Sequence, residues 1–234
     1  LAVNVTTLRI VDNSRIRHSS NTDTKIYTIN ISAVNFTIDS SSLIDVKSNG
    51  YSTTNGPGAG SSADAGGAYG GSGGYGNKVP SYGSVTQPLD LGSGGYDGSA
   101  GGGAIFLNVS DTLNVTGHIS SNSSYAGGSG SGSGGSIYIS TNHFVGNGSI
   151  LAAAGDSSGI GGDSSGGGGR IAIYFVDRSF NGQIGAPGGD DDDGFDGGSG
   201  TVYLKDQNES LGNLILTNNP SVNSEASTIL NSTT

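Results

Sequence analysis

The sequence predicts an all-β fold, a parallel β-helix (a solenoid) of about 5–7 coils with Gly-rich loops and almost no helix. Three observations predict it. A short apolar block recurs with a period of about 31–34 residues, apolar and polar residues alternate inside each block, and 45 of the 234 residues are glycine. Alternation with a period of two indicates strands with one buried face, and no segment shows the 3.6-residue apolar stripe of an amphipathic helix.

The repeated block starts at Gly103, Gly135, Gly169 and Gly200. A second marker follows each block start after 12 to 14 residues: Gly117-His118-Ile119, Gly148-Ser149-Ile150, Gly182-Gln183-Ile184 and Gly212-Asn213-Leu214. One such unit cannot bury its apolar face alone, so the units must stack. We therefore expect a ladder of Ile105, Ile137, Ile171 and Val202. A β-sandwich would instead need antiparallel hairpins with tight turns.

The first part of the chain carries the same pattern in a weaker form. Residues 29–37 align, with one gap, with residues 107–116, which matches Asn30 with Asn108. Residues 8–16 resemble an earlier turn and residues 222–230 a final one. We interpret the chain as one continuous domain with three parts: N-terminal β-helix coils in residues 1–50, a Gly/Tyr-rich excursion packed on the solenoid in residues 51–103, and the main repeats in residues 104–234.

Glycine is concentrated between the predicted strands. Residues 56–103 contain 18 glycines, and three shorter tracts, in residues 126–135, 155–169 and 185–200, occupy the same place in successive units. Unpatterned Gly/Ser tracts are flexible linkers. Recurrence at one register favours the other interpretation, in which glycine lets neighbouring backbones approach closely.

Charge and composition exclude several classes of partner. The chain has 9 basic and 19 acidic residues, a net charge of −10, which opposes binding to nucleic acid or to an anionic membrane. No apolar run approaches the roughly 20 residues of a membrane span, so no membrane insertion is expected. The absence of cysteine excludes disulfides and thiolate metal sites. Because the chain starts with Leu1 and shows no signal segment, we interpret it as a mature or excised segment.

Covalent modification gives the strongest chemical pattern in the sequence. Asn30, Asn108 and Asn114 lie between apolar residues of predicted strands, so the period of two directs them outward, where glycans fit. We therefore expect N-linked glycans and a secreted, extracellular or cell-surface location; in a bacterial host the same asparagines would be plain polar positions. Nine Asn-x-Ser/Thr sequons are present, at Asn4, Asn30, Asn35, Asn108, Asn114, Asn122, Asn147, Asn208 and Asn231.

One acidic segment is a candidate metal site. Clustered aspartates with neighbouring glycines are suited to Ca²⁺, and the candidate ligands are Asp190, Asp191, Asp192, Asp193 and Asp196. The pattern is not an EF-hand, and a solvated acidic loop fits the composition equally well. The sequence requires no other cofactor.

Few residues of the sequence are suited to catalysis. Arg170, Lys205, Asp177 and Asp206 are the only plausible ones, and no carboxylate pair recurs at positions that would line one groove. The three histidines lack the ligand spacing of a zinc site. His118 occupies the same place as a serine and a glutamine in later units, so we expect it to point outward from a strand. The sequence therefore predicts a protein that is not an enzyme.

The run from Gly166 to Tyr174, together with the earlier run from Gly134 to Ile139, resembles Gly-rich repeats of very large cell-surface and extracellular proteins. These are adhesin-like, right-handed parallel β-helix proteins, and the resemblance covers about residues 94–216. It implies a structural or adhesive extracellular role, with no catalytic residues to carry over. The density of sequons is also similar to that of heavily glycosylated fibrils and flagellar hairs (mastigonemes).

The ends of the predicted solenoid indicate assembly. Residues 1–10 and 226–230 both read as strands without a capping helix, and open strand edges must be capped or paired. Copies stacked head to tail, or adjacent repeats of a larger chain, would pair both edges, and contacts that do not close into a ring give filaments. The leading hypothesis is thus a structural, glycosylated subunit of an extracellular filament or cell-surface fibre.

Two other functions remain open from the sequence. One is a carbohydrate-binding or polysaccharide-acting (lyase- or hydrolase-like) β-helix protein, in which Tyr138 and Tyr203 stack on sugars, although Ala172 interrupts that ladder. The other is an ice- or surface-binding solenoid, which would need stacked Thr-x-Thr rows where this chain has mixed residues.

Overall fold

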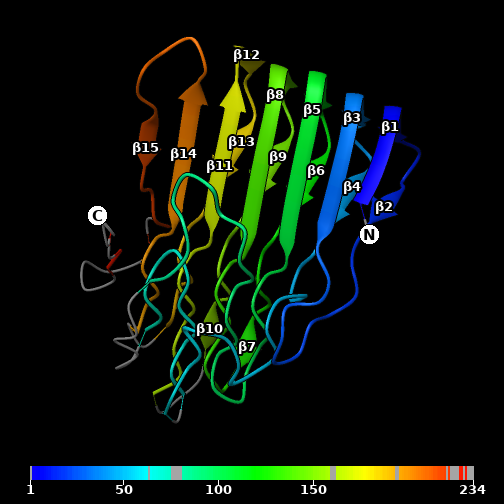
Figure 1. The fold of residues 1–234 in the computed structure, drawn as a ribbon. Coiled ribbons are helices and arrows are strands. Elements are labelled where there is room, and N and C mark those ends of the chain that lie inside the picture. Colours follow the sequence, from blue (N-terminus) through cyan, green and yellow to red (C-terminus); the bar gives the residue numbers. More distant parts are fainter. Residues whose placement is uncertain are drawn as a thin grey trace.

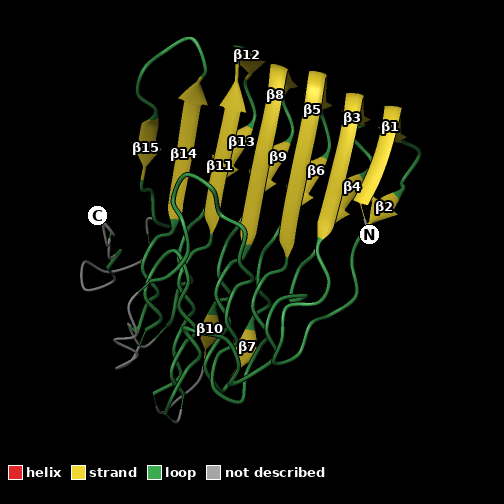
Figure 2. Ribbon diagram, viewed as in Figure 1, coloured by secondary structure: helices red, strands yellow, loops and turns green. Residues whose placement is uncertain are grey.

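In the computed structural model, the chain forms an all-β, parallel β-solenoid of about six turns, as the repeats predict. The structure describes residues 2–62, 64–74, 81–158, 162–192, 195–219, 221, 227–228 and 230, and these contain no helix. The strands of successive turns lie side by side as two layers, and the glycine-rich segments extend beyond one end of both layers (Figures 1 and 2).

One long sheet carries a strand from every turn. Its order is β1-β3-β5-β8-β11-β14-β15, with the short β12 also paired to β8. Every pair in this path is parallel and joins successive turns, except the antiparallel pair of β14 and β15. The strands are β1 (Ala2–Ile10), β3 (Ile29–Ile38), β5 (Ala104–Val115), β8 (Ser136–Gly146), β11 (Arg170–Phe175), β12 (Asp177–Phe180), β14 (Thr201–Asp206) and β15 (Asn213–Ile215).

A second sheet of short strands forms the other layer. Its order is β13-β9-β6-β4-β2, and all of its pairs are parallel. The strands are β2 (Arg15–Ile16), β4 (Leu43–Asp45), β6 (His118–Ser120), β9 (Ser149–Leu151) and β13 (Gln183–Gly185), and a separate two-stranded sheet consists of β7 (Ala126–Gly127) and β10 (Ser157–Ser158). The turns that begin with β3, β5, β8 and β11 therefore pass through the long sheet, the second sheet and a glycine-rich segment.

The core is the column of side chains between the two layers. The expected ladder of Ile105, Ile137, Ile171 and Val202 is confirmed, because these residues are direct partners in adjacent strands and at most 5% exposed. Full burial of one such side chain contributes about 1.5–3 kcal/mol. A narrow column of apolar residues, one set per turn, thus explains how an ordered fold forms from a chain that is only 32% hydrophobic.

The glycine-rich segments pack against one another rather than hanging free. A side chain on Gly135 would overlap the carbonyl oxygen of Gly103, and one on Gly169 would overlap that of Gly135. Hydrogen bonds link the segments laterally, from Gly168 N–H to the Gly198 carbonyl (2.9 Å) and from Gly134 N–H to the Gly167 carbonyl (3.0 Å). The missing side chains are therefore what allows these backbones to bond directly.

The excursion of residues 51–103 lies against the glycine segments of later turns. Gly67 N–H donates to the Ser131 carbonyl (2.8 Å), and Gly70 N–H donates to the Gly168 carbonyl (2.9 Å). Tyr69 is fully buried, and its hydroxyl is 2.7 Å from Ser136 Oγ. The excursion thus contacts turns that are far from its own position in the stack.

Two details of the predicted alignment are wrong. Residues 29–38 pair with residues 105–115 in a register shifted by two, so that Asn30 lies beside Phe106 rather than Asn108. Both registers keep the same residues facing inward, so the alternation does not distinguish them. The single gap is confirmed as an irregularity between Ala33 and Phe36.

The prediction for Gly212-Asn213-Leu214 is also wrong. These residues do not continue the second sheet; β15 turns back and pairs antiparallel with β14, with Leu214 opposite Tyr203. A turn at residues 207–211 reverses the chain, and Gly212 lies against the Tyr203 ring, where a side chain would overlap it. At the other end, β1 and β2 form the earlier turn, which starts at Ala2 rather than Leu8. Of the suggested final turn, residues 222–226 and 229 lie outside the described residues.

Candidate functional site

The sequon asparagines concentrate on the first three strands of the long sheet. Asn4 lies on β1, Asn30 and Asn35 on β3, and Asn108 and Asn114 on β5. Asn4, Asn30, Asn108, Asn147 and Asn208 are exposed, whereas Asn35, Asn114 and Asn122 are partly buried, and Asn231 lies outside the described residues. The outward face of the long sheet thus carries most of these asparagines at its N-terminal half.

Two sequon side chains take part in contacts between turns. Asn122 Oδ1 accepts a hydrogen bond from Ala153 N–H (2.8 Å), and Asn208 Nδ2 donates to the Val176 carbonyl (3.0 Å). A glycan is attached through the side-chain amide nitrogen. The Asn208 hydrogen bond uses that nitrogen and therefore competes with glycosylation, whereas the Asn122 hydrogen bond uses only the amide oxygen. The sequon asparagines that are exposed and make neither of these contacts are Asn4, Asn30, Asn108 and Asn147.

The buried carboxylates of the acidic segment accept hydrogen bonds from other groups of the protein. Asp191 is 5% exposed; it accepts hydrogen bonds from Ser157 Oγ (2.8 Å) and Phe195 N–H (3.1 Å). Asp196, 7% exposed, accepts one from Asp191 N–H (2.8 Å). Asp190 and Asp192 lie beside them and Asp193 lies outside the described residues. Within the described residues no three His, Cys, Asp or Glu side chains gather as metal ligands.

Of the residues considered for catalysis, Arg170 lies at the opposite end of its strand from the other three. Arg170 starts β11, whereas Lys205 and Asp206 end β14 and Asp177 starts β12. Lys205 Nζ donates to the carbonyls of Asp206 (3.0 Å) and Glu209. No ion pair joins any two of these four side chains in the part of the chain that the structure describes.

Two of the histidines, His118 and His143, are exposed on the strands. His118 is exposed and pairs in the ladder with Ser149, so its predicted outward orientation is confirmed. His143 lies between two carboxylates, 3.7 Å from Asp111 Oδ1 and 3.1 Å from Asp177 Oδ2, which the ligand-spacing argument did not predict. His143 and Asp177 are partners in neighbouring strands, so an alignment of the repeats would have revealed this group.

Aromatic side chains line the C-terminal half of the long sheet's outer face. Ala172 does interrupt the ladder between Tyr138 and Tyr203, but Tyr174 fills the gap: its ring centre lies 5.6 Å from Tyr138 and 5.9 Å from Tyr203. The three tyrosines thus form one continuous row, which the alternation rule missed because Tyr174 lies two residues further along its strand.

A segment of the excursion crosses this aromatic face. Residues 81–91, here called the strap, are held by hydrogen bonds from Tyr174 Oη to the Thr86 carbonyl (2.8 Å) and from Arg170 Nε to the Tyr82 carbonyl (2.9 Å). Burial raises the pKa of Tyr82 well above its ordinary value and lowers the pKa of Arg170. A cavity opens on each side of the strap.

The first cavity, of about 610 Å³, lies towards the sequon asparagines. Its lining includes the aromatic pair Phe106 and Tyr138 together with Lys25, Asn30 and Asn108. Glycans on those two asparagines would stand at its rim. The second cavity, of about 750 Å³, contains Arg170 and lies towards β15.

The two ends of the stack differ from its middle. Val3 and Val5 of β1 are partners of Ile31 and Ala33 and therefore face inward, yet they are 37% and 39% exposed because no other turn of the described residues covers them. At the other end β15 is the last strand of the long sheet among the described residues, and Ile215, the partner of the inward Val202, is 41% exposed. Each end thus presents apolar side chains.

Comparisons with protein-family models, with curated proteins and with solved structures found no match to this chain. No helix of the described residues is long and apolar enough to span a membrane.

Proposed function

We propose that the protein is a structural, glycosylated subunit of an extracellular filament or cell-surface fibre, in which copies, or adjacent repeats of a larger chain, stack head to tail. The observation that carries this proposal is the open N-terminal end of the core. Positions equivalent to Val3 are buried in the next two turns, where Ile31 and Leu107 are 3% and 1% exposed. One more turn stacked on β1 would bury these valines as well.

The C-terminal end supplies a complementary surface. In a stack of equally oriented copies, the outer edge of β15 meets the outer edge of the next copy's β1, and the two strands run antiparallel because β15 opposes β14. In the second sheet, β13 would meet β2 in the parallel sense. Pairing these edges also removes the exposed N–H and C=O groups that make open sheets prone to uncontrolled association.

The outward asparagines support the extracellular part of the proposal. Asn30, Asn108 and Asn147 lie along the side of the rod. Asn4 is on the terminal strand β1 but on its outward face, so glycans at these positions would coat a filament without occupying the strand edge at the junction. Enzymatic removal of N-linked glycans from the native protein, followed by mass spectrometry, tests this part: attachment at Asn4, Asn30, Asn108 and Asn147 is expected, and unmodified asparagines in a secreting eukaryotic host would contradict it.

Electron microscopy of purified protein over a range of concentrations tests the assembly. We expect filaments for the unmodified chain and isolated short rods for the double variant Val3→Asp/Val5→Asp, because a buried carboxylate at the junction would oppose stacking. Asn4→Asp/Thr6→Asp, which adds the same two charges on the outward side of β1, is the matched control and should still form filaments. Short rods at every concentration of the unmodified chain, or filaments in the double variant, would overturn the head-to-tail junction.

A further inference from the structure

The cavity beside the strap holds a buried cation without a carboxylate partner. Arg170 is 2% exposed, and its guanidinium lies 5.5 Å from the centre of the Tyr69 ring. Its Nε donates to the Tyr82 carbonyl (2.9 Å) and its Nη1 to Thr201 Oγ1 (3.1 Å). All of these neighbours are neutral. No ion pair includes Arg170 within the described residues, and Asp90 influences its charge only from a distance.

The guanidinium keeps donors for a ligand. Its Nη2 atom makes no hydrogen bond to any described residue, and the side chain forms part of the cavity wall. Burying a charge without a counter-charge is costly, and a planar guanidinium matches a carboxylate with two parallel N–H···O bonds. The site is therefore suited to an incoming carboxylate.

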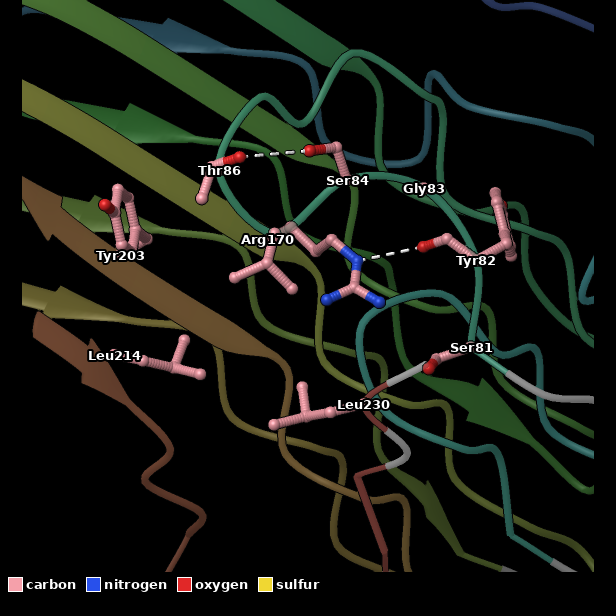
Figure 3. Close-up of a pocket in the computed structure, with 10 residues that line it drawn as sticks. Ser81, Tyr82, Gly83, Ser84, Thr86, Arg170, Tyr203, Leu214 and Leu230 are labelled. Carbon is pink, nitrogen blue, oxygen red and sulfur yellow. Dashed lines mark hydrogen bonds between the residues drawn. The ribbon is translucent and has the colours of Figure 1, made fainter. Parts of the chain in front are cut away.

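The walls of the cavity are divided by polarity. Figure 3 shows Ser84 and Thr86 of the strap on one side of the guanidinium, with Leu214 and Leu230 on the opposite side. Tyr203, the last member of the tyrosine row, lines the cavity beside β15. A pyranose ring has the same division, with apolar C–H groups on its faces and hydroxyls at its rim, and a cavity of about 750 Å³ is large enough for it.

We propose that this cavity binds an acidic sugar, a hexuronate unit, with its carboxylate on Arg170 and its ring against Tyr203 and Leu214. The sugar hydroxyls then face Ser84 and Thr86 of the strap. The proposal does not depend on filament assembly, since the cavity lies on the outer face of the long sheet and within one copy of the chain.

The test is a titration of the ¹⁵N-labelled protein, carrying Val3→Asp/Val5→Asp so that it stays as short rods, with sodium glucuronate, glucose and sodium acetate, followed by NMR; these two residues lie at the other end of the stack from the cavity. We expect glucuronate to shift the Nε–Hε signal of Arg170 and the amide signals of Ser84 and Thr86. Glucose, which lacks the carboxylate, should bind at least about tenfold more weakly, as expected for loss of a charge-assisted hydrogen bond. Equal binding of glucose and glucuronate, or no shift of the Arg170 signal, would overturn the proposal.

Two variants separate the contribution of the Arg170 charge to sugar binding from that of the apolar cavity wall. Arg170→Gln should abolish the preference for glucuronate over glucose, with the exposed Arg178→Gln as the matched control. Since loss of a buried arginine can disturb the fold, Leu214→Ala provides a second test on a partly exposed side chain: it should weaken glucuronate binding and leave acetate binding unchanged. If acetate binds as well as glucuronate in the unmodified chain, the cavity is a simple anion site and the sugar assignment is wrong.

Discussion

At the scale of single residues, close packing determines two properties: where glycine is required, and which protonation state a buried histidine has. Glycine is required where backbones meet, because the carbonyl of one turn occupies the space of a side chain in the next, as at Gly135 and Gly169. Burial similarly fixes the protonation of His18, which is 7% exposed. Its Nδ1 is 2.7 Å from the Ser19 carbonyl, and its Nε2 accepts a hydrogen bond from Ala104 N–H (3.3 Å). The carbonyl can only accept, so Nδ1 carries the single proton of a neutral ring.

This neutral histidine predicts a pH dependence of stability. Burial lowers the pKa of His18 from 6.5. Above pH 6.5 the ring is neutral in both states and has no effect. As the pH falls below that value, the unfolded chain binds a proton that the folded chain resists, so the free energy of unfolding decreases, by at most about 1.4 kcal/mol per pH unit, until the folded pKa is reached.

Urea unfolding at a series of pH values between about 7 and 5 measures this effect. His18→Gln keeps a hydrogen-bonding side chain without the titration and should remove this part of the pH dependence. His118→Gln and His143→Gln change exposed rings and should retain it. An unchanged slope in His18→Gln would show that another group is responsible.

At the scale of elements, β15 is the strand whose position is most open to a direct test. In the structure Leu214 lies opposite Tyr203 in an antiparallel pair. The sequence pattern instead predicts a parallel continuation of the second sheet, in which Leu214 follows Ile184. Directly opposed residues in an antiparallel pair have Cα atoms about 4.5–5.5 Å apart, within the range that a disulfide bridges. The chain has no cysteine of its own, which keeps the experiment simple.

The double variant Tyr203→Cys/Leu214→Cys should therefore form a disulfide under mild oxidation, as measured by mass spectrometry of non-reduced peptides. The matched variant Ile184→Cys/Leu214→Cys should stay reduced. The opposite result would place β15 in the second sheet, where the repeat pattern predicts it.

The positions of the strands could be predicted from the sequence, but the pairing and register between neighbouring strands could be predicted only in part. Alternation identifies the inward residues of β5, β8, β11 and β14 because one face of each strand is buried. It leaves the register of β3 open by two residues, and it does not detect the reversal before β15, which is caused by a local turn. Arg170 carried one overlooked signal: it occupies a position that is Ala, Ser or Thr in the other turns. A long charged side chain at a buried, small-residue position indicates a special environment.

At the scale of the whole molecule, the excursion changes how the stack holds together. In a simple solenoid each turn contacts only its neighbours, so stability is a sum of local terms and the ends can unfold first. Here the excursion leaves the stack after β4 and bonds to later turns, with Gly70 N–H on the Gly168 carbonyl (2.9 Å) and Ser72 Oγ on the Ser227 carbonyl (2.8 Å). These contacts join the second turn to the last ones, so the stack is expected to unfold as one cooperative unit.

Gly70→Ala tests this cooperativity, because its methyl group would overlap the Gly169 carbonyl oxygen and prevent docking of the excursion. We expect a loss of about 1–3 kcal/mol, a broader urea transition, and faster amide hydrogen exchange in β11 and β14 than in β3 and β5. Gly185→Ala is the matched control, since its methyl group would lie 3.6 Å from Leu151 Cδ2 and keep ordinary contacts. If Gly70→Ala lowers stability equally in all strands and the transition stays sharp, the turns are coupled through the core column alone, and the excursion contributes packing without linking distant turns.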